Sequence, residues 1–146
     1  MRKKAVMFML AMLTLQVVMA GDVVTKDINQ LPATARTFIS KYFPKVTVSY
    51  IKVDKDMFKS KTYDATLSNS TEIEFNSKGE WTEVDCKKKA IPQELIPMEI
   101  AKYIQTNYAN QKVVKIERDR KGCTVGLANG LDVKFDPYGG FIKLED

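Results

Sequence analysis

The sequence predicts an α+β fold built from two tandem repeats, each with one helix packed on a four-stranded antiparallel sheet. Two phrases occur twice. FNSKGEWTEVD at 75–85 returns as FDPYGGFIKLE at 135–145, and LPATARTFISKYF, which begins at Leu31, returns as IPMEIAKYIQTNY from Ile96. The phrases that begin at Leu31 and Ile96 have the apolar period of a helix, whereas the segments after them alternate apolar and polar residues as half-buried strands do.

The N-terminus has the pattern of a secretory signal peptide over residues 1–20. Basic residues at 2–4 precede an apolar run from 5 to 20, and Val18 and Ala20 are small enough for the −3 and −1 positions of a cleavage site. An uncleaved membrane anchor is the other interpretation, but about 16 apolar residues are fewer than the roughly 20 that span a bilayer. We therefore expect a periplasmic or secreted protein with no membrane attachment after cleavage.

The first repeat spans residues 21–86. Pro32 suits the first turn of its helix, because an N–H at that position would have no partner in the helix, and Pro44 ends the helix. Apolar residues recur at helical spacing at Ala35, Phe38, Ile39 and Tyr42. The strands then alternate, with apolar positions at Tyr63, Ala65, Leu67, Ile73 and Phe75. Such alternation is typical of an antiparallel sheet with one buried face.

The second repeat spans residues 96–146 and comes after a linker at 87–95. Its helix begins at Pro97 and has an apolar stripe at Ile100, Tyr103 and Ile104. Asn129-Gly130 is a strong signal for a hairpin between two of its strands. Because one helix covers only one face of each sheet, we expect one broad or two adjacent sheet faces to be open.

The last strand of each repeat predicts a contact surface for a protein partner. By alternation, an inward-pointing Val84 places Trp81 and Glu83 outward, and the same rule places Phe141 and Lys143 outward in the second repeat. Aromatic residues are enriched at the centres of interfaces. The predicted partner-binding residues are Trp81, Glu83, Phe141, Lys143, Tyr50 and Tyr138. The other interpretation is that Trp81 and Phe141 close the edge of the core or pack between the repeats.

The charge balance gives no support to nucleic-acid binding. Of the 23 basic residues, cleavage removes the three in the signal peptide. The 20 that remain, against 18 acidic residues, give a net charge of +2. A nucleic-acid interface needs a clustered basic face. The one basic run after the signal peptide, at 87–89, lies in the predicted linker, where a solvated position is the ordinary explanation.

The residue types exclude several kinds of catalysis. The chain has no histidine, which removes the Ser-His-Asp and Cys-His arrangements and the usual zinc ligand set. Paired acidic residues such as Glu72 and Glu74 are interpreted as solvent-facing positions of the sheet. Asp54, Asp56 and Asp64 lack the ligand spacing of a calcium loop. We expect no catalytic residue, no metal and no cofactor, and hence a protein that is not an enzyme.

Two cysteines, Cys86 and Cys123, remain in a compartment that permits disulfides. They fall at non-equivalent places in the two repeats. A disulfide between them and two separate half-buried thiols are both consistent with the sequence.

The motifs resemble those of the PepSY-like secreted proteins of Bacteroidetes. The pattern LPxxAxxFIxKYFP, then VxxI, an Asn-Gly hairpin and (I/V)xFxxxGxW, covers roughly residues 28–146. The resemblance implies a fold similar to that of the β-lactamase inhibitory protein and a periplasmic or secreted location, and it brings no established activity. Two positions depart from the pattern: Ser70 replaces the usual hairpin glycine, and Phe141 stands where the first copy has Trp81.

From these observations we expect a non-enzymatic module that occupies or inhibits a protein partner with its open sheet face. The resemblance points to an extracytoplasmic enzyme such as a peptidase, by analogy of fold alone. The second hypothesis is a scaffold that binds a small hydrophobic or peptide ligand in the groove between the repeats.

Overall fold

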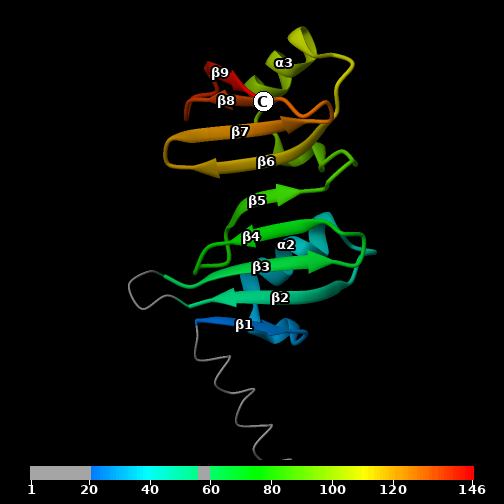
Figure 1. Ribbon diagram of the computed structural model, residues 1–146, viewed down its shortest axis with the longest axis vertical. Helices are drawn as coiled ribbons and strands as arrows, with labels where there is room; N and C mark the ends of the chain where they lie inside the picture. Colours follow the sequence, from blue (N-terminus) through cyan, green and yellow to red (C-terminus); the bar gives the residue numbers. More distant parts are fainter. Residues whose placement is uncertain (1–20, 56–59) are drawn as a thin grey trace, which may run out of the picture.

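Nine strands form one antiparallel sheet, in which the order of the strands in space is their order in the sequence (Figure 1). The computed structural model describes residues 21–55 and 60–146. The strands are β1 (Asp22–Thr25), β2 (Val48–Asp54), β3 (Thr62–Leu67), β4 (Glu72–Phe75), β5 (Trp81–Asp85), β6 (Val113–Asp119), β7 (Gly122–Leu127), β8 (Asp132–Phe135) and β9 (Phe141–Glu145). The signal peptide predicted at 1–20 lies outside the described residues.

Two α-helices, α2 (Ala33–Tyr42) and α3 (Met98–Asn107), lie on the same face of the sheet, and two short 3-10 helices, η1 (Ile28–Gln30) and η2 (Gln93–Leu95), precede them. Each α-helix begins directly after a proline, Pro32 or Pro97, as expected for a residue that lacks an N–H. Each presents one apolar stripe to the sheet. In the described part of the chain, no helix is long and apolar enough to cross a membrane.

A single row of buried side chains joins all the central strands beneath the helices. The register places them opposite one another from β2 to β8: Ile51, Ala65, Ile73, Val84, Ile116, Val125 and Val133. None is more than 1% exposed. Burying a Val or Ile side chain contributes roughly 1.5–3 kcal/mol, so this row stabilises the whole sheet as one unit.

The predicted α+β class is confirmed, but the sheet differs from the prediction. The prediction has one four-stranded sheet for each repeat, whereas β5 pairs with β6 through Val84 and Ile116 and merges all strands into one sheet. The short strand β1 was not predicted and adds to the edge of β2. The order of one helix and four strands occurs twice along the chain. Within 87–95, Ile91 and Leu95 are buried in the common core.

Candidate binding surfaces

Bulges at the start of β5 and β9 turn two of the predicted contact residues to the helix-covered face. Glu74 pairs with Glu83 but the next pair is Phe75 with Trp81, so Thr82 is an extra residue in β5. The register of β8 and β9 shifts in the same way, and Phe141 pairs with the buried Phe135. The prediction that Trp81 and Phe141 point to the open face is wrong, because simple alternation does not hold across a bulge.

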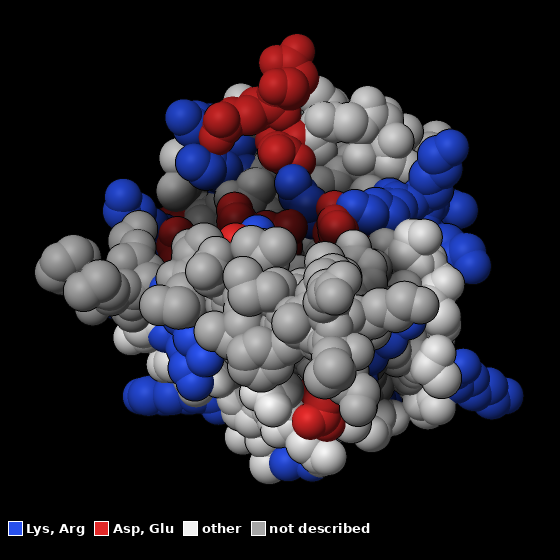
Figure 2. Space-filling view, turned by 60° about the horizontal axis from the view of Figure 1, so that its bottom comes forward, with Lys and Arg blue, Asp and Glu red and all other residues white. Residues whose placement is uncertain are grey.

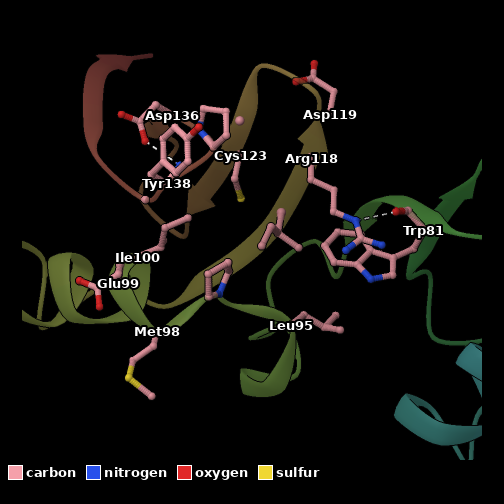
Figure 3. A pocket seen from close by; sticks show the side chains of 15 residues that line it. Trp81, Leu95, Met98, Glu99, Ile100, Arg118, Asp119, Cys123, Asp136 and Tyr138 are labelled. Carbon is pink, nitrogen blue, oxygen red and sulfur yellow. Dashed lines mark hydrogen bonds between the residues drawn. The ribbon is translucent and has the colours of Figure 1, made fainter.

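Trp81 is buried where the two halves of the chain meet. It is 9% exposed and packs against the ring of Phe38 from α2, with 6.2 Å between the ring centroids. On its other side the guanidinium carbon of Arg118, from β6, lies 3.7 Å from the ring centroid. The Nε of Arg118 also donates a hydrogen bond of 2.8 Å to the backbone oxygen of Trp81 (Figure 3). Trp81 therefore packs between the halves, as the second interpretation of the sequence expects.

Phe141 occupies the equivalent position of the last strand. Its ring stacks on Tyr103 of α3 at 5.1 Å and meets Phe135 edge-on at 6.5 Å. The sheet ends at β9, and Phe141 remains 44% exposed. It covers the end of the core without being enclosed.

The open face carries three of the predicted contact residues. Glu83 on β5 and Lys143 on β9 point away from the helices. Their register partners, Glu74 and Lys134, are polar residues of the open face. Tyr50, 42% exposed on β2, pairs with Thr66 of that face. Tyr138 lies elsewhere, in the turn between β8 and β9, and is 90% exposed.

Four carboxylates lie side by side across the middle of the open face. Asp64, Glu74, Glu83 and Glu117 come from β3, β4, β5 and β6, and each pairs directly with the next. We call this row the acidic ladder. Like charges directly opposite each other destabilise a sheet, so the ladder is a local cost to folding. Figure 2 shows acidic side chains gathered in a recessed part of the surface with basic side chains around them.

The ladder shifts the proton affinity of its members. Burial, and after it the nearby Glu74, raises the pKa of Asp64 to about 6. Burial, and after it a hydrogen bond with the Glu117 carboxyl, raises the pKa of Glu83 to about 7. Asp64 is likewise hydrogen-bonded to Glu74. The four carboxyls thus form two hydrogen-bonded pairs, and in each pair one member, Asp64 or Glu83, holds its proton to a higher pH than a free carboxyl does.

Basic groups lie beside the ladder, and the charges of Lys115 and Lys52 partly oppose the rise in the pKa of Glu83 and Asp64. Lys52 of β2 lies next to Asp64 in the register but pairs with Asp22 at 3.4 Å. Lys87 forms ion pairs with Glu72 and Asp85. The hydroxyl of Thr82, the bulge residue, donates a hydrogen bond of 2.8 Å to Glu74. The central pair of Glu83 and Glu117 has no ion pair among those found in the described residues.

Sequence reasoning missed four site residues: Asp64, Glu117, Glu74 and Arg118. The first two belong to strands that are distant in the sequence, and only the pairing of β5 with β6 brings Glu117 beside Glu83. A signal existed in part: both residues stand at polar positions of alternating segments. Arg118 has no comparable signal, because its contact with Trp81 depends on the junction of the two halves.

The two cysteines are free thiols in the structure. Cys86 is buried at the end of β5, and Cys123 is half-buried on the helix side of β7. Burial raises the pKa of both, that of Cys123 to about 11. Both are therefore protonated at neutral pH and pack as small apolar groups.

The fold defines an α+β protein whose two helices cover one side of a single sheet and leave a charged face open. The family model described as "Putative beta-lactamase-inhibitor-like, PepSY-like" matches residues 61–143. The chain belongs to this PepSY-like family, and the resemblance noted in the sequence is confirmed. A search of curated proteins gives no match.

Three solved structures from Bacteroides are similar over most of this chain. A "putative periplasmic protein of unknown function" from Bacteroides vulgatus is 54% identical with a TM-score of 0.84, and covers 86% of this chain and 100% of its own. A second protein from Bacteroides vulgatus, of the DUF2874 family, is 42% identical with a TM-score of 0.79 and covers 86% and 97%. A "putative calcium-regulated periplasmic protein" from Bacteroides thetaiotaomicron is 38% identical with a TM-score of 0.80 and also covers 86% and 97%.

These relatives agree with the export predicted from the N-terminus. All three are described as periplasmic. The expected location, periplasmic or secreted, is confirmed, whereas the cleavage position after Ala20 stays a prediction.

Proposed function

We propose that this protein is a non-enzymatic binding module whose open sheet face holds a basic surface of an extracytoplasmic protein. The observation that carries the proposal is the acidic ladder, Asp64, Glu74, Glu83 and Glu117. Like charges placed opposite each other cost stability, and side chains that break a folding rule in this way are often functional.

The shape of the open face fits this role. A hollow of about 330 Å³ lies over β2 to β5, and three ladder residues, Asp64, Glu74 and Glu83, line it. Tyr50 and Lys52 line it as well, and Lys52 is paired with Asp22. Tyrosine is a frequent anchor residue in protein interfaces. A lysine or arginine of the partner entering this hollow would meet several carboxylate oxygens at once and form charge-assisted hydrogen bonds.

The shifted proton affinity gives the interaction a signature. At pH 7 Glu83 is about half protonated, because its pKa is about 7. A cation placed beside it favours the ionised form, so binding should release protons. The attraction should also weaken with salt, since exposed charges are screened over about 10 Å at 0.1 M ionic strength.

The partner we favour is an extracytoplasmic enzyme, such as a peptidase. Support comes from the family description, which names an inhibitor-like protein, and from the periplasmic location of the relatives. This support is an analogy of family and fold.

Calcium is not part of the proposal, although one relative is described as calcium-regulated. Over residues 21–55 and 60–146, no group of three or more acidic, histidine or cysteine residues could hold a metal ion. The ladder carboxylates come from neighbouring strands at the fixed spacing of the sheet, and the donors that are present do not form the cage of six to eight oxygens that calcium prefers.

Affinity capture tests the proposal. The chain from residue 21 to 146 is immobilised and exposed to an extracytoplasmic extract of its source at low and high salt. We expect a discrete protein to be retained by the wild type and released by about 0.5 M salt. A Glu74→Gln/Glu83→Gln variant should lose that protein.

The matched control is Glu94→Gln/Glu99→Gln, which makes the same two chemical replacements in η2 and α3 on the helix side. It should retain the protein. The proposal fails if both double variants lose it equally, if both keep it, or if the wild type retains no protein. Isothermal calorimetry in buffers of different ionisation enthalpy then measures the expected proton release with the purified partner.

A further inference from the structure

A cavity of about 350 Å³ lies on the helix side of the sheet, away from the acidic ladder (Figure 3). Its inner wall is apolar and buried, formed by Leu95, Ile100 and Ile116, with the ring of Trp81 at one end. Cys123 completes the wall as a protonated thiol. Two large apolar side chains stand exposed at the rim, Met98 at 71% and Tyr138 at 90%.

The corresponding place in the first half of the chain is filled. The register places Tyr63 where the second half has Cys123: each pairs with the buried phenylalanine of the next strand, Phe75 or Phe135. Tyr63 is only 8% exposed and occupies the space with its ring. The second half has a small thiol at this place, and Cys123 lines the cavity beneath α3.

The rims of the two places differ as well. When the two repeats are aligned in sequence, Met98 stands where the first half has Ala33, and Tyr138 stands where it has Lys78. The second half therefore has both a hollow and an apolar mouth. An exposed methionine and an exposed aromatic residue beside an apolar cavity are typical of a ligand site.

One cation reaches the cavity at the Trp81 end. The guanidinium of Arg118 stacks on the indole and lines the cavity. The ion pairs found among the described residues do not include Arg118. Its Nε is used by the Trp81 backbone, but its two terminal nitrogens form the edge that commonly binds a carboxylate with two hydrogen bonds.

The acidic residues at the mouth are engaged in local contacts. Asp136 accepts hydrogen bonds from the backbone N–H groups of Tyr138 and Gly140. Asp119 accepts one from the backbone N–H of Lys121, and Glu99 lies 4.0 Å from the ammonium of Lys102. A carboxylate ligand is therefore expected to place its head at Arg118 and not at the mouth.

We propose that this cavity binds a small amphiphile with an apolar body and a single carboxylate, of the fatty-acid class, with the carboxylate on Arg118 and the acyl chain along Leu95, Ile100 and Cys123. The volume fits about ten to twelve non-hydrogen atoms, taking about 30 Å³ for each water-sized group. Decanoate has this size. The site is independent of the open sheet face, so either proposal can fail alone.

Trp81 makes the test direct, because it is the chain's one tryptophan and it lines the cavity. Decanoate, decanol and decylamine are titrated against the purified protein, and tryptophan fluorescence is recorded. Decanoate should change the emission with saturation and bind at least tenfold more tightly than either analogue with the same chain. Arg118→Gln should weaken decanoate about tenfold and leave decanol unchanged.

Three further measurements remain informative if Arg118→Gln fails to fold. Cys123→Tyr, which places in the cavity the residue that fills the first half, should abolish decanoate binding. In the wild type, decanoate should slow alkylation of Cys123 and not of Cys86, as read by peptide mass mapping. Tyr138→Ser should weaken binding, whereas the matched Lys78→Ser should not.

Several results would overturn the proposal. One is that decanol or decylamine binds as tightly as decanoate. A second is that decanoate gives no saturable change of fluorescence and no protection of Cys123. A third is that neither Arg118→Gln nor Cys123→Tyr affects decanoate binding.

Discussion

The two halves of the chain build the same aromatic cluster and cover it differently. In the first half Phe38 meets Phe75 edge-on at 5.8 Å and lies beside Trp81. In the second half Tyr103 meets Phe135 edge-on at 5.4 Å and stacks on Phe141. Trp81 is 9% exposed and Phe141 is 44% exposed.

The difference arises from the neighbour that each cluster has in the sheet. Beyond β5 comes β6, whose Arg118 closes over the Trp81 ring, whereas β9 is the edge of the sheet. Trp81 and Phe141 therefore occupy equivalent positions in the two repeats but have different surroundings in the sheet. The large tryptophan stands at the junction, where its ring contacts both halves, and the smaller phenylalanine stands at the edge.

The largest expected effect is on stability at this pair of positions. Trp81→Ala should destabilise the protein by about 3–5 kcal/mol, because it empties the junction of the two halves. Phe141→Ala should cost about half of that or less, since nearly half of its surface is already exposed. Urea denaturation of both variants measures the difference. Equal losses would show that the two positions have the same environment after all.

The second effect concerns the residue that fills or opens the space beneath each helix. Tyr63→Ala should cost about 3 kcal/mol, because it empties a filled site. Cys123→Ala should cost about 1 kcal/mol or less, because its thiol already borders a cavity. The same denaturation experiment applies. A larger loss for Cys123→Ala than for Tyr63→Ala would contradict the comparison.

A smaller effect should appear on the open face and depend on pH. Folding raises the pKa of Glu83 from 4.5 to about 7, mainly through burial. Between these two pH values the folded state therefore binds more protons than the unfolded state. The stability contributed by this group should therefore be complete below about pH 4.5 and fall as the pH rises through 7. Glu83→Gln cannot ionise, and it should be more stable than the wild type at pH 8 by about 1 kcal/mol after solvent screening.

Denaturation of the wild type and Glu83→Gln from pH 5 to about pH 8.5 checks this prediction. Glu94→Gln on η2 serves as the control with the same chemical change, and it should show no such trend. Wild-type stability that rises across this range relative to Glu83→Gln would have the wrong sign for a raised pKa.

The smallest effect is on thiol chemistry, with no change in stability. A pKa of about 11 for Cys123 against 9.0 for a free thiol lowers its thiolate fraction about a hundredfold at pH 8. Its alkylation should be slowed by about that factor relative to an unstructured cysteine peptide. Alkylation at the rate of the peptide would show that the thiol is not buried beneath α3.

The helices and the alternating strands could be predicted because their signals are local. Pro32 and Pro97 mark the helix starts, and the period of the apolar residues identifies the buried faces. The bulges at Thr82 and Ile142 have no comparable signal in the sequence. One extra residue in a strand moves the residues beyond it to the opposite face from the one that simple alternation predicts. This is why Glu83 and Lys143 were placed correctly and Trp81 and Phe141 were not.

The features that depend on contacts distant in the sequence could not be predicted. The pairing of Val84 with Ile116, which merges the strands into one sheet, has no local cause in either segment. The acidic ladder is a consequence of that pairing, since it brings Glu117 beside Glu83. The different packing of Tyr63 and Cys123 required the structure, because it depends on the helix and strands around each residue.

The most direct measurement is an NMR titration of the side-chain carboxyl carbons of Glu83 and Asp64. Burial of the ladder, and after it the neighbouring carboxyls, predicts midpoints near 7 for Glu83 and near 6 for Asp64, and a downward shift of both when a basic partner binds. Midpoints of about 4 for both residues, the values of free carboxyls, would contradict the acidic ladder and remove the basis of the proposed binding function.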